Sequence, residues 1–131
     1  MVSDTIGDFI IRLKNAGAVG KTATSVPYSQ LRHAIADKLC ASGYLEKVEV
    51  KGKTVQSKVL ELTLKYNNAK HVINGVKRIS KPGRRLEVGV AGINPVKFGK
   101  GHLVLSTPAG ILTGEEAKEK NVGGEQLFMI W

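Results

Sequence analysis

The stretch YLEKVEVKGKTVQSKVLELTLKY, residues 44–66, contains two runs in which apolar and polar side chains alternate. In the first run Val48 and Val50 alternate with charged residues, and in the second the leucines from Leu60 onward alternate with polar residues. A period of two is typical of strands that bury one face. The glycine and lysines of Lys51–Lys53 favour a turn between the runs. The stretch therefore predicts a β-hairpin.

Two amphipathic helices and a short strand are predicted before this hairpin. SDTIGDFIIRLKNAG (residues 3–17) and SQLRHAIADKLCAS (residues 29–42) both place apolar side chains at helical spacing, and Ser29 is a suitable cap for the second helix. Between them, KTATSVPY (residues 21–28) is rich in β-branched residues, which favours a short strand, and Pro27 would end this strand. Residues 1–66 are therefore predicted to form a small N-terminal α/β domain with the element order αβαββ.

Strands dominate the sequence after the polar stretch NNAK (Asn67–Lys70), which we interpret as the domain boundary. The predicted strands are HVINGVKRIS (71–80), RRLEVGV (84–90), HLVLST (102–107), GILT (110–113) and EQLFMIW (125–131). Thr113 and Glu116 have the spacing of a capping box, which predicts one short helix between the last two strands. Residues 67–131 are therefore predicted to be a second small domain, mostly antiparallel β with one short helix. The fold class is α+β.

Charge is the most informative feature of the composition. The 131 residues include 20 Lys and Arg against 11 Asp and Glu, which gives a net charge of +9 and a pI near 9.8. Most of the excess lies between Lys70 and Lys100, where Glu87 is the one acid among the basic residues Lys70, Lys77, Arg78, Lys81, Arg84, Arg85, Lys97 and Lys100. A small basic domain of this kind is typical of proteins that bind a polyanion.

The single cysteine, Cys40, excludes an intramolecular disulfide and favours a reducing compartment. No apolar run approaches the length of a membrane span, and the N-terminus lacks the layout of a signal peptide. We therefore expect a soluble, cytoplasmic protein without a membrane partner.

Patterns that would indicate catalysis are weak. The three histidines are far apart without metal-ligand spacing, and Ser106 lacks the G-x-S-x-G elbow of a serine nucleophile. The GKG at residues 99–101 lacks the spacing of a phosphate-binding loop. We expect no catalytic residue, no metal, no cofactor and no small-molecule substrate. A small hydrolase that uses Ser106 stays as the remote alternative.

The kind of nucleic acid follows from what the chain lacks. It shows no helix-turn-helix, zinc-finger or basic-zipper pattern, and its few aromatic residues are not paired as stacking platforms. The remaining candidate is folded RNA, which proteins recognise by its shape and by contacts to its backbone and its hydroxyl groups. The residues that we expect to touch it fall into three groups. The basic residues Lys77, Arg78, Lys81, Arg84 and Arg85 around one tight turn would contact phosphates. Ser106 and Thr107 offer hydroxyls at a strand end, and Gly110, Gly123 and Gly124 would allow close approach to a sugar or a base edge. Purely structural roles explain these residues equally well. Thr107–Gly110 would then be an ordinary turn, and Gly123 and Gly124 would end the preceding helix.

Three stretches resemble one known family. In chain order, these are SDTIGDFIIRLKNA (3–16), RISKPGRR (78–85) and STPAGILT (106–113) with a following EA and GGE. They resemble motifs that occur in the same order in ribosomal protein eight of the small subunit, bacterial type. The likeness covers nearly the whole chain. One departure is Pro108, where a second serine is common in the family.

The resemblance implies a two-domain protein that binds small-subunit ribosomal RNA directly and early in assembly, at a helix with an irregular core in the central domain. It implies that Lys81, Arg84 and Arg85 lie in the basic turn and would attract phosphates. It also implies that the hydroxyl-bearing motif and its G-G-E are formed by Ser106, Thr107, Gly110, Gly123, Gly124 and Glu125. In this motif the two hydroxyls would bond ribose or an exposed base, and Glu125 would brace the loop or accept from a base amine. Neighbours would be small-subunit proteins five and twelve. The nearer alternative is a translational repressor that binds its own messenger RNA.

Overall fold

The structure of the chain is a computed structural model that describes residues 5–54, 56–67, 70–81, 83–94 and 101–131. The chain divides into two compact units. We call Asp8–Ile73 the N-terminal unit, and we call Asn74–Trp131, with which residues 5–7 are grouped, the C-terminal unit. Each unit has its own sheet.

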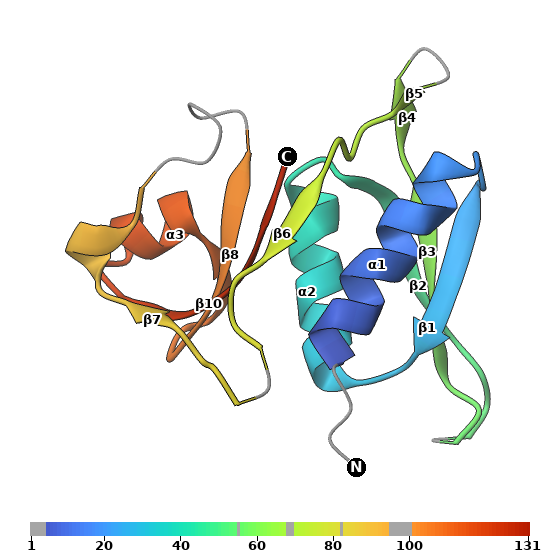
Figure 1. Ribbon diagram of the computed structural model, residues 1–131. Helices are drawn as coiled ribbons and strands as arrows, with labels where there is room; N and C mark the ends of the chain where they lie inside the picture. The colour runs from blue at the N-terminus through green and yellow to red at the C-terminus, as the bar shows by residue number, and fades with distance from the viewer. Residues whose placement is uncertain (1–4, 55, 68–69, 82, 95–100) are drawn as a thin grey trace. The chain divides into compact units, whose positions relative to one another are not determined.

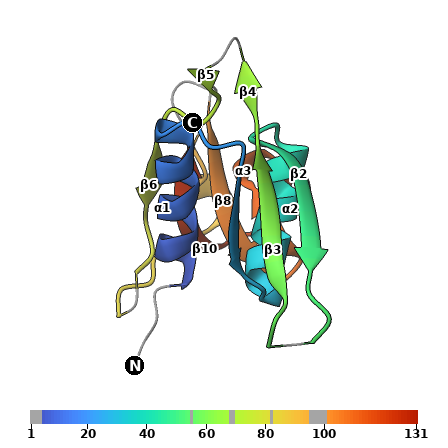
Figure 2. The same ribbon diagram turned by 90° about the vertical axis from the view of Figure 1, so that its right-hand side faces the viewer.

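The N-terminal unit has the predicted order αβαββ. Its elements are α1 (Thr5–Ala18), β1 (Ala23–Pro27), α2 (Gln30–Ala41), β2 (Leu45–Lys51) and β3 (Val59–Leu64). The three strands form an antiparallel sheet in the order β1-β3-β2, and both helices lie on one face of it (Figures 1 and 2). Two short strands, β4 (Tyr66–Asn67) and β5 (Lys70–His71), pair with each other after β3. The predicted boundary at Asn67–Lys70 includes residues 68 and 69, which lie outside the described residues.

The alternating pattern of the hairpin explains the core of this unit. Leu60, Leu62 and Leu64 are all buried on β3, which is the central strand and pairs with β2 as predicted. Val50 differs from the prediction, because it is 40% exposed. It lies near the end of β2, an edge strand of the sheet, where a side chain has neighbours on fewer sides. The cap of α2 is confirmed, because the Ser29 hydroxyl accepts a hydrogen bond from the Arg32 N–H at 3.1 Å.

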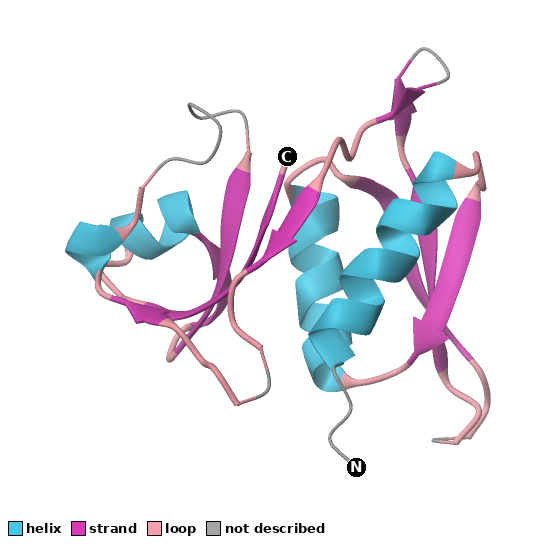
Figure 3. Cartoon of the chain, viewed as in Figure 1, coloured by secondary structure: helices cyan, strands magenta, loops and turns pink. Residues whose placement is uncertain are grey.

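The C-terminal unit is mostly antiparallel β, with one short α-helix among its described residues. Figure 3 colours this helix and a 3-10 turn of the same unit as helices. Its elements are β6 (Val76–Arg78), β7 (Glu87–Val88), a 3-10 turn (Val90–Gly92), β8 (His102–Thr107), β9 (Gly110–Thr113), α3 (Gly114–Glu119) and β10 (Gly124–Ile130). The strand order is β6-β10-β8-β9, and β7 pairs with a different part of β10. The predicted α+β fold class is confirmed.

The capping box predicted for α3 is present. The Thr113 hydroxyl accepts from the Glu116 N–H, and the Glu116 carboxylate accepts from the Thr113 N–H at 3.0 Å. Behind this helix lies a core made of Ile93, Leu103, Leu105, Leu112 and Ala117. No helix in the described part of the chain is long and apolar enough to span a membrane.

Two predicted strands are shorter than expected. The stretch 71–80 is strand only at its start and at β6. Gly75 and Trp131 exchange backbone hydrogen bonds directly before β6, and the Asn74 N–H also donates to the Trp131 carbonyl, so the pairing with the β10 segment ends at this point. The Trp131 ring also packs where a Gly75 side chain would stand. The stretch 84–90 is strand only at β7, since its first residue belongs to a tight turn.

Candidate nucleic-acid interface

The basic stretch between β6 and β7 folds into the predicted tight turn. Lys81 and Arg84 exchange backbone hydrogen bonds, 2.9 Å in each direction. Gly83 has φ +81°, which is the value that the third position of a type II turn requires. Lys81, Arg84 and Arg85 are exposed. Of the other residues named in this basic region, Pro82, Lys97 and Lys100 lie outside the described residues.

Ser80 fixes the base of this turn. Its side chain is buried, and its hydroxyl accepts from the Leu86 N–H at 2.9 Å and lies 3.4 Å from the Leu86 carbonyl, to which it donates. The Ser80 N–H donates to the Gln126 carbonyl at 3.1 Å, and the Gln126 N–H donates to the Leu86 carbonyl at 2.8 Å. Both ends of the turn are therefore attached to β10 at Gln126. Our sequence reasoning missed Ser80, although a serine directly before Lys-Pro-Gly is a signal for a hydroxyl that bonds to turn backbone.

Glu125, next to Gln126, lies at the centre of the candidate site. In the sheet it is opposite Ser106 of β8 on one side and opposite Glu87 of β7 on the other. Residues opposite each other on antiparallel strands project from the same face. The sheet register therefore places the Ser106 hydroxyl and two carboxylates on one face.

An open depression of about 600 Å³ lies at this end of the sheet. It is lined by Glu87, Val88, Gly89, Ser106, Thr107, Pro108, Gly123, Gly124 and Glu125. Arg85, from the basic turn, places its Nη1 3.3 Å from Oε1 of Glu125. Five of the predicted site residues therefore line the depression: Ser106, Thr107, Gly123, Gly124 and Glu125. Arg85 contacts one of them, Glu125. Lys81, Arg84 and Gly110 do not line the depression.

The two hydroxyls differ in what they bond. The Thr107 hydroxyl donates to the Gly110 carbonyl at 2.8 Å and accepts from the Ala109 N–H at 3.1 Å, so it holds the turn between β8 and β9. The Ser106 hydroxyl makes no hydrogen bond to any residue that the structure describes, although it lines the depression. Ser106 is therefore the hydroxyl that is available to a ligand.

The glycines also serve different purposes. A side chain on Gly124 would collide with the Ser106 carbonyl, and one on Gly123 with the Val88 carbonyl. Because these glycines have no side chain, β10 and the residue before it can approach the neighbouring backbone closely. The space at these two positions is therefore filled by the protein's own backbone. Gly110 has open space around it and φ +110°, a backbone conformation that favours glycine at the end of the turn.

Charge divides the surface into two chemically distinct parts. The two carboxylates, Glu87 and Glu125, would repel a phosphate placed inside the depression. They suit hydrogen-bond donors, such as base amines and ribose hydroxyls. The exposed cations of the turn, by contrast, suit phosphates. Within the residues that the structure describes, no group of His, Cys, Asp and Glu side chains is arranged to hold a metal ion.

Comparison with known proteins gives one consistent result. The model of the family described as "Ribosomal protein S8" matches residues 4–131. A protein of Vesicomyosocius okutanii is 44% identical over 130 residues, which is 99% of this chain and 98% of the relative. A protein of Nitratidesulfovibrio vulgaris, strain Miyazaki F, is 40% identical over 131 residues and all of both chains, and one of Dictyoglomus turgidum is 42% identical over 130 residues, 99% and 98% of the two. All three carry the name "Small ribosomal subunit protein uS8".

Proposed function

The chain belongs to the ribosomal protein S8 family, and from this membership we propose that it is a structural protein of the small ribosomal subunit that binds ribosomal RNA through its C-terminal unit. The relatives reported above are named as ribosomal proteins and not as enzymes. The observation that carries the proposal is the depression at the end of β8 and β10, with a basic turn attached to its border.

Lys81, Arg84 and Arg85 bind phosphates in this proposal. Their side chains are exposed on a turn whose base is fixed by Ser80, so a phosphate can reach them without a rearrangement of the backbone. Contacts of this kind release counterions and make affinity strongly dependent on salt, but they carry little sequence information.

The depression supplies the specific contacts. The Ser106 hydroxyl bonds a ribose hydroxyl or a base edge, and the Glu125 carboxylate accepts from a base amine when Arg85 turns toward a phosphate. Thr107 contributes indirectly, because its hydroxyl holds the turn that borders the depression. Gly123 and Gly124 contribute by allowing the strands to pack closely enough to form it. Such a surface recognises a base that is exposed in a folded RNA rather than one within a regular helix.

The finer details follow from the resemblance. We propose that the RNA is the irregular helix in the central domain of small-subunit ribosomal RNA, that binding occurs early in assembly, and that the neighbours are small-subunit proteins five and twelve. The place of action would be the ribosome in the cytoplasm.

A direct test is the affinity of the purified chain for three RNAs at one salt concentration near 0.1 M. The first is the central domain of small-subunit ribosomal RNA, the second is the same RNA with its irregular helix replaced by a regular one, and the third is a regular duplex of equal length. We expect tight binding only to the first. Equal binding to all three would mean that the surface attracts phosphates without recognising a shape, and would contradict the proposal.

A further inference from the structure

Asn74 and Gly75, directly before β6, form the one Asn-Gly pair in the sequence. In such a pair the glycine nitrogen can attack the carboxamide carbon of the asparagine, because a residue without Cβ leaves this approach open. A bond forms between the nitrogen and Cγ, ammonia leaves, and the product is a cyclic succinimide. Water then opens the ring at either carbonyl and gives aspartate or isoaspartate. The pair therefore contains the groups that deamidation requires.

The structure holds the nitrogen that would attack. The Gly75 N–H donates to the Trp131 carbonyl at 3.1 Å, and the Trp131 N–H donates back to the Gly75 carbonyl at 3.0 Å. The Asn74 N–H donates to the same Trp131 carbonyl at 2.7 Å. An amide nitrogen whose proton is bonded in this way keeps the proton and cannot turn toward the neighbouring side chain. Asn74 itself is exposed, so water can reach its carboxamide.

The Trp131 ring keeps these hydrogen bonds closed. Gly75 is buried, and a methyl group added to it would lie 2.6 Å from Cζ2 of this ring. The ring also packs against the core behind α3. The missing side chain of Gly75 therefore has two consequences, because it gives the ring its place and it makes the Asn-Gly pair reactive.

The Gly75–Trp131 pair lies at the end of a strand pairing. β6 and β10 pair from Val76 with Ile130 to Arg78 with Phe128, and the Gly75–Trp131 bonds extend this pairing by one step. Figure 1 shows the end of β10 beside the start of β6. The last step of a pairing has bonded neighbours on one side only, so it opens more readily than the interior of the sheet. Such an opening frees the Gly75 nitrogen while the rest of the sheet stays folded.

We propose that Asn74 is a site of spontaneous deamidation, which reacts only while the bonds between Gly75 and Trp131 are open. Isoaspartate lengthens the main chain by one carbon atom, so the pairing with Trp131 cannot re-form in the same register and the opening becomes permanent. Aspartate instead adds a negative charge close in sequence to Lys77 and Arg78. This inference does not rest on the proposed function.

The first experiment measures the rate of deamidation at Asn74 in the complete chain, in a mildly alkaline buffer with and without guanidinium chloride that unfolds it. Peptide mass spectrometry detects the conversion, and chromatography separates the aspartate and isoaspartate products. Two hydrogen bonds at their usual net strength change an equilibrium by about five- to a hundredfold. We expect the folded chain to react more slowly by a factor in this range or above it. Equal rates would overturn the proposal, and so would an unreactive Asn74 in the unfolded chain.

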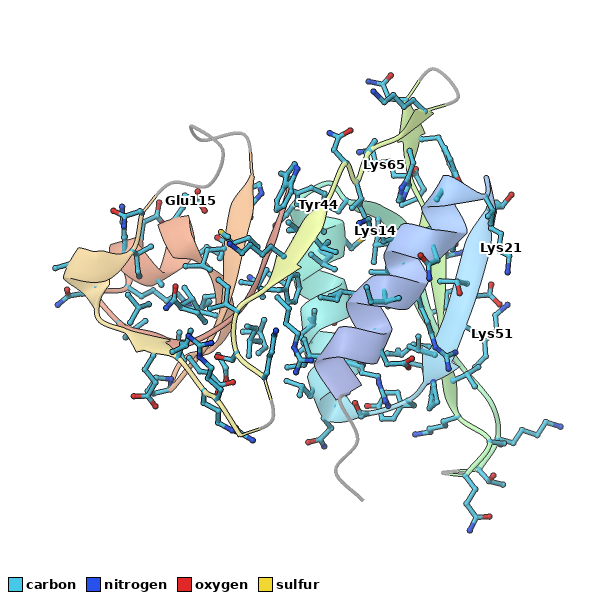
Figure 4. The ribbon with its side chains drawn as sticks, viewed as in Figure 1. Lys14, Lys21, Tyr44, Lys51, Lys65 and Glu115 are labelled. Carbon is cyan, nitrogen blue, oxygen red and sulfur yellow. The ribbon has the colours of Figure 1, made fainter. Side chains whose placement is uncertain are left out.

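Two variants separate local opening from a general loss of stability. Trp131→Ala and Val122→Ala each truncate a partly buried side chain that packs against the same core, but Trp131 also covers Gly75. Figure 4 shows α3, which is marked by Glu115, and β6 on opposite sides of β8. Val122 follows α3, whereas Asn74 precedes β6. We expect faster deamidation of Asn74 in Trp131→Ala and an unchanged rate in Val122→Ala.

Hydrogen exchange of the Gly75 amide, measured in the same buffer, decides whether the Trp131 bond is the barrier. Exchange reports the fraction of time for which this amide is open. We expect Trp131→Ala to raise the exchange rate of Gly75 and the deamidation rate of Asn74 by the same factor. If Trp131→Ala does not fold, the same proportionality is expected in the unmodified chain as guanidinium chloride is raised below the unfolding transition. A deamidation rate that does not follow Gly75 exchange, or an equal acceleration in both variants, would overturn the proposal.

Discussion

Replacing Gly124 by alanine tests how the candidate site is built. The added methyl group would collide with the Ser106 carbonyl, which is backbone and cannot rotate away, so β10 must separate from β8 at the point where both border the depression. Overpacking of this kind typically costs about 1 to 3 kcal/mol. Alanine also restricts the unfolded chain, which stabilises by about 0.4 to 1 kcal/mol, so the midpoints of the two ranges give a net loss of about 1.3 kcal/mol.

Gly89→Ala is the matched control, because Gly89 lines the same depression. A methyl group there would meet nothing within 4 Å, and its φ of −82° is open to alanine. The assay is urea denaturation of each variant, followed by hydrogen exchange of the amides in β8 and β10. We expect lower stability and faster exchange for Gly124→Ala only. The explanation of the two glycines would be refuted if Gly124→Ala were as stable as the unmodified chain, or if both variants lost stability equally.

Three further changes test other parts of the structure. Ser80→Ala removes a buried hydroxyl that bonds Leu86 twice, so we expect urea denaturation to show a loss of about 1 to 3 kcal/mol; an unchanged midpoint would contradict its role at the base of the basic turn. Burial lowers the pKa of His71, so between this lowered pKa and the ordinary value of 6.5 the unfolded chain binds more protons than the folded chain. Stability should therefore fall as the pH drops below about 6.5, and His71→Gln should reduce this dependence, which equilibrium denaturation at pH 5 and pH 7.5 would measure. Gly17→Ala places a methyl group where the His71 ring packs, so we expect it to lower the melting temperature, and a melting temperature equal to that of the unmodified chain would contradict the packing.

Local patterns were sufficient to predict most elements. The alternation of Leu60, Leu62 and Leu64 predicted a strand that the structure places at the centre of a sheet, and the Thr113–Glu116 spacing predicted the start of α3. These signals succeed because the interactions that they describe are local. The capping hydrogen bonds join residues three positions apart, and the buried face belongs to a single strand.

The errors arose where distant residues decide the structure. The pairing of the stretch 71–80 with the β10 segment ends where Gly75 meets Trp131, although nothing in the local sequence except Asn-Gly at 74 and 75 indicates a break. The same holds for the site. The basic turn and the Ser106–Thr107 motif were both recognised from the sequence, but the pairing of Arg85 with Glu125, 40 residues away, and the attachment of Ser80 to Gln126 depend on the sheet register.

The central claim is that the basic turn binds phosphates and that the depression makes the specific contacts. The salt dependence of RNA binding by two variants tests this claim most directly. Arg84→Ala with Arg85→Ala removes two exposed cations, whereas Ser106→Ala removes a neutral hydroxyl inside the depression. With the RNA of the central domain, we expect the arginine variant to reduce the slope of log affinity against log salt by about 1.4 to 1.8. Ser106→Ala should lower affinity about three- to tenfold, the equivalent of one lost hydrogen bond, at an unchanged slope. Identical effects of the two variants on slope and affinity would contradict the account.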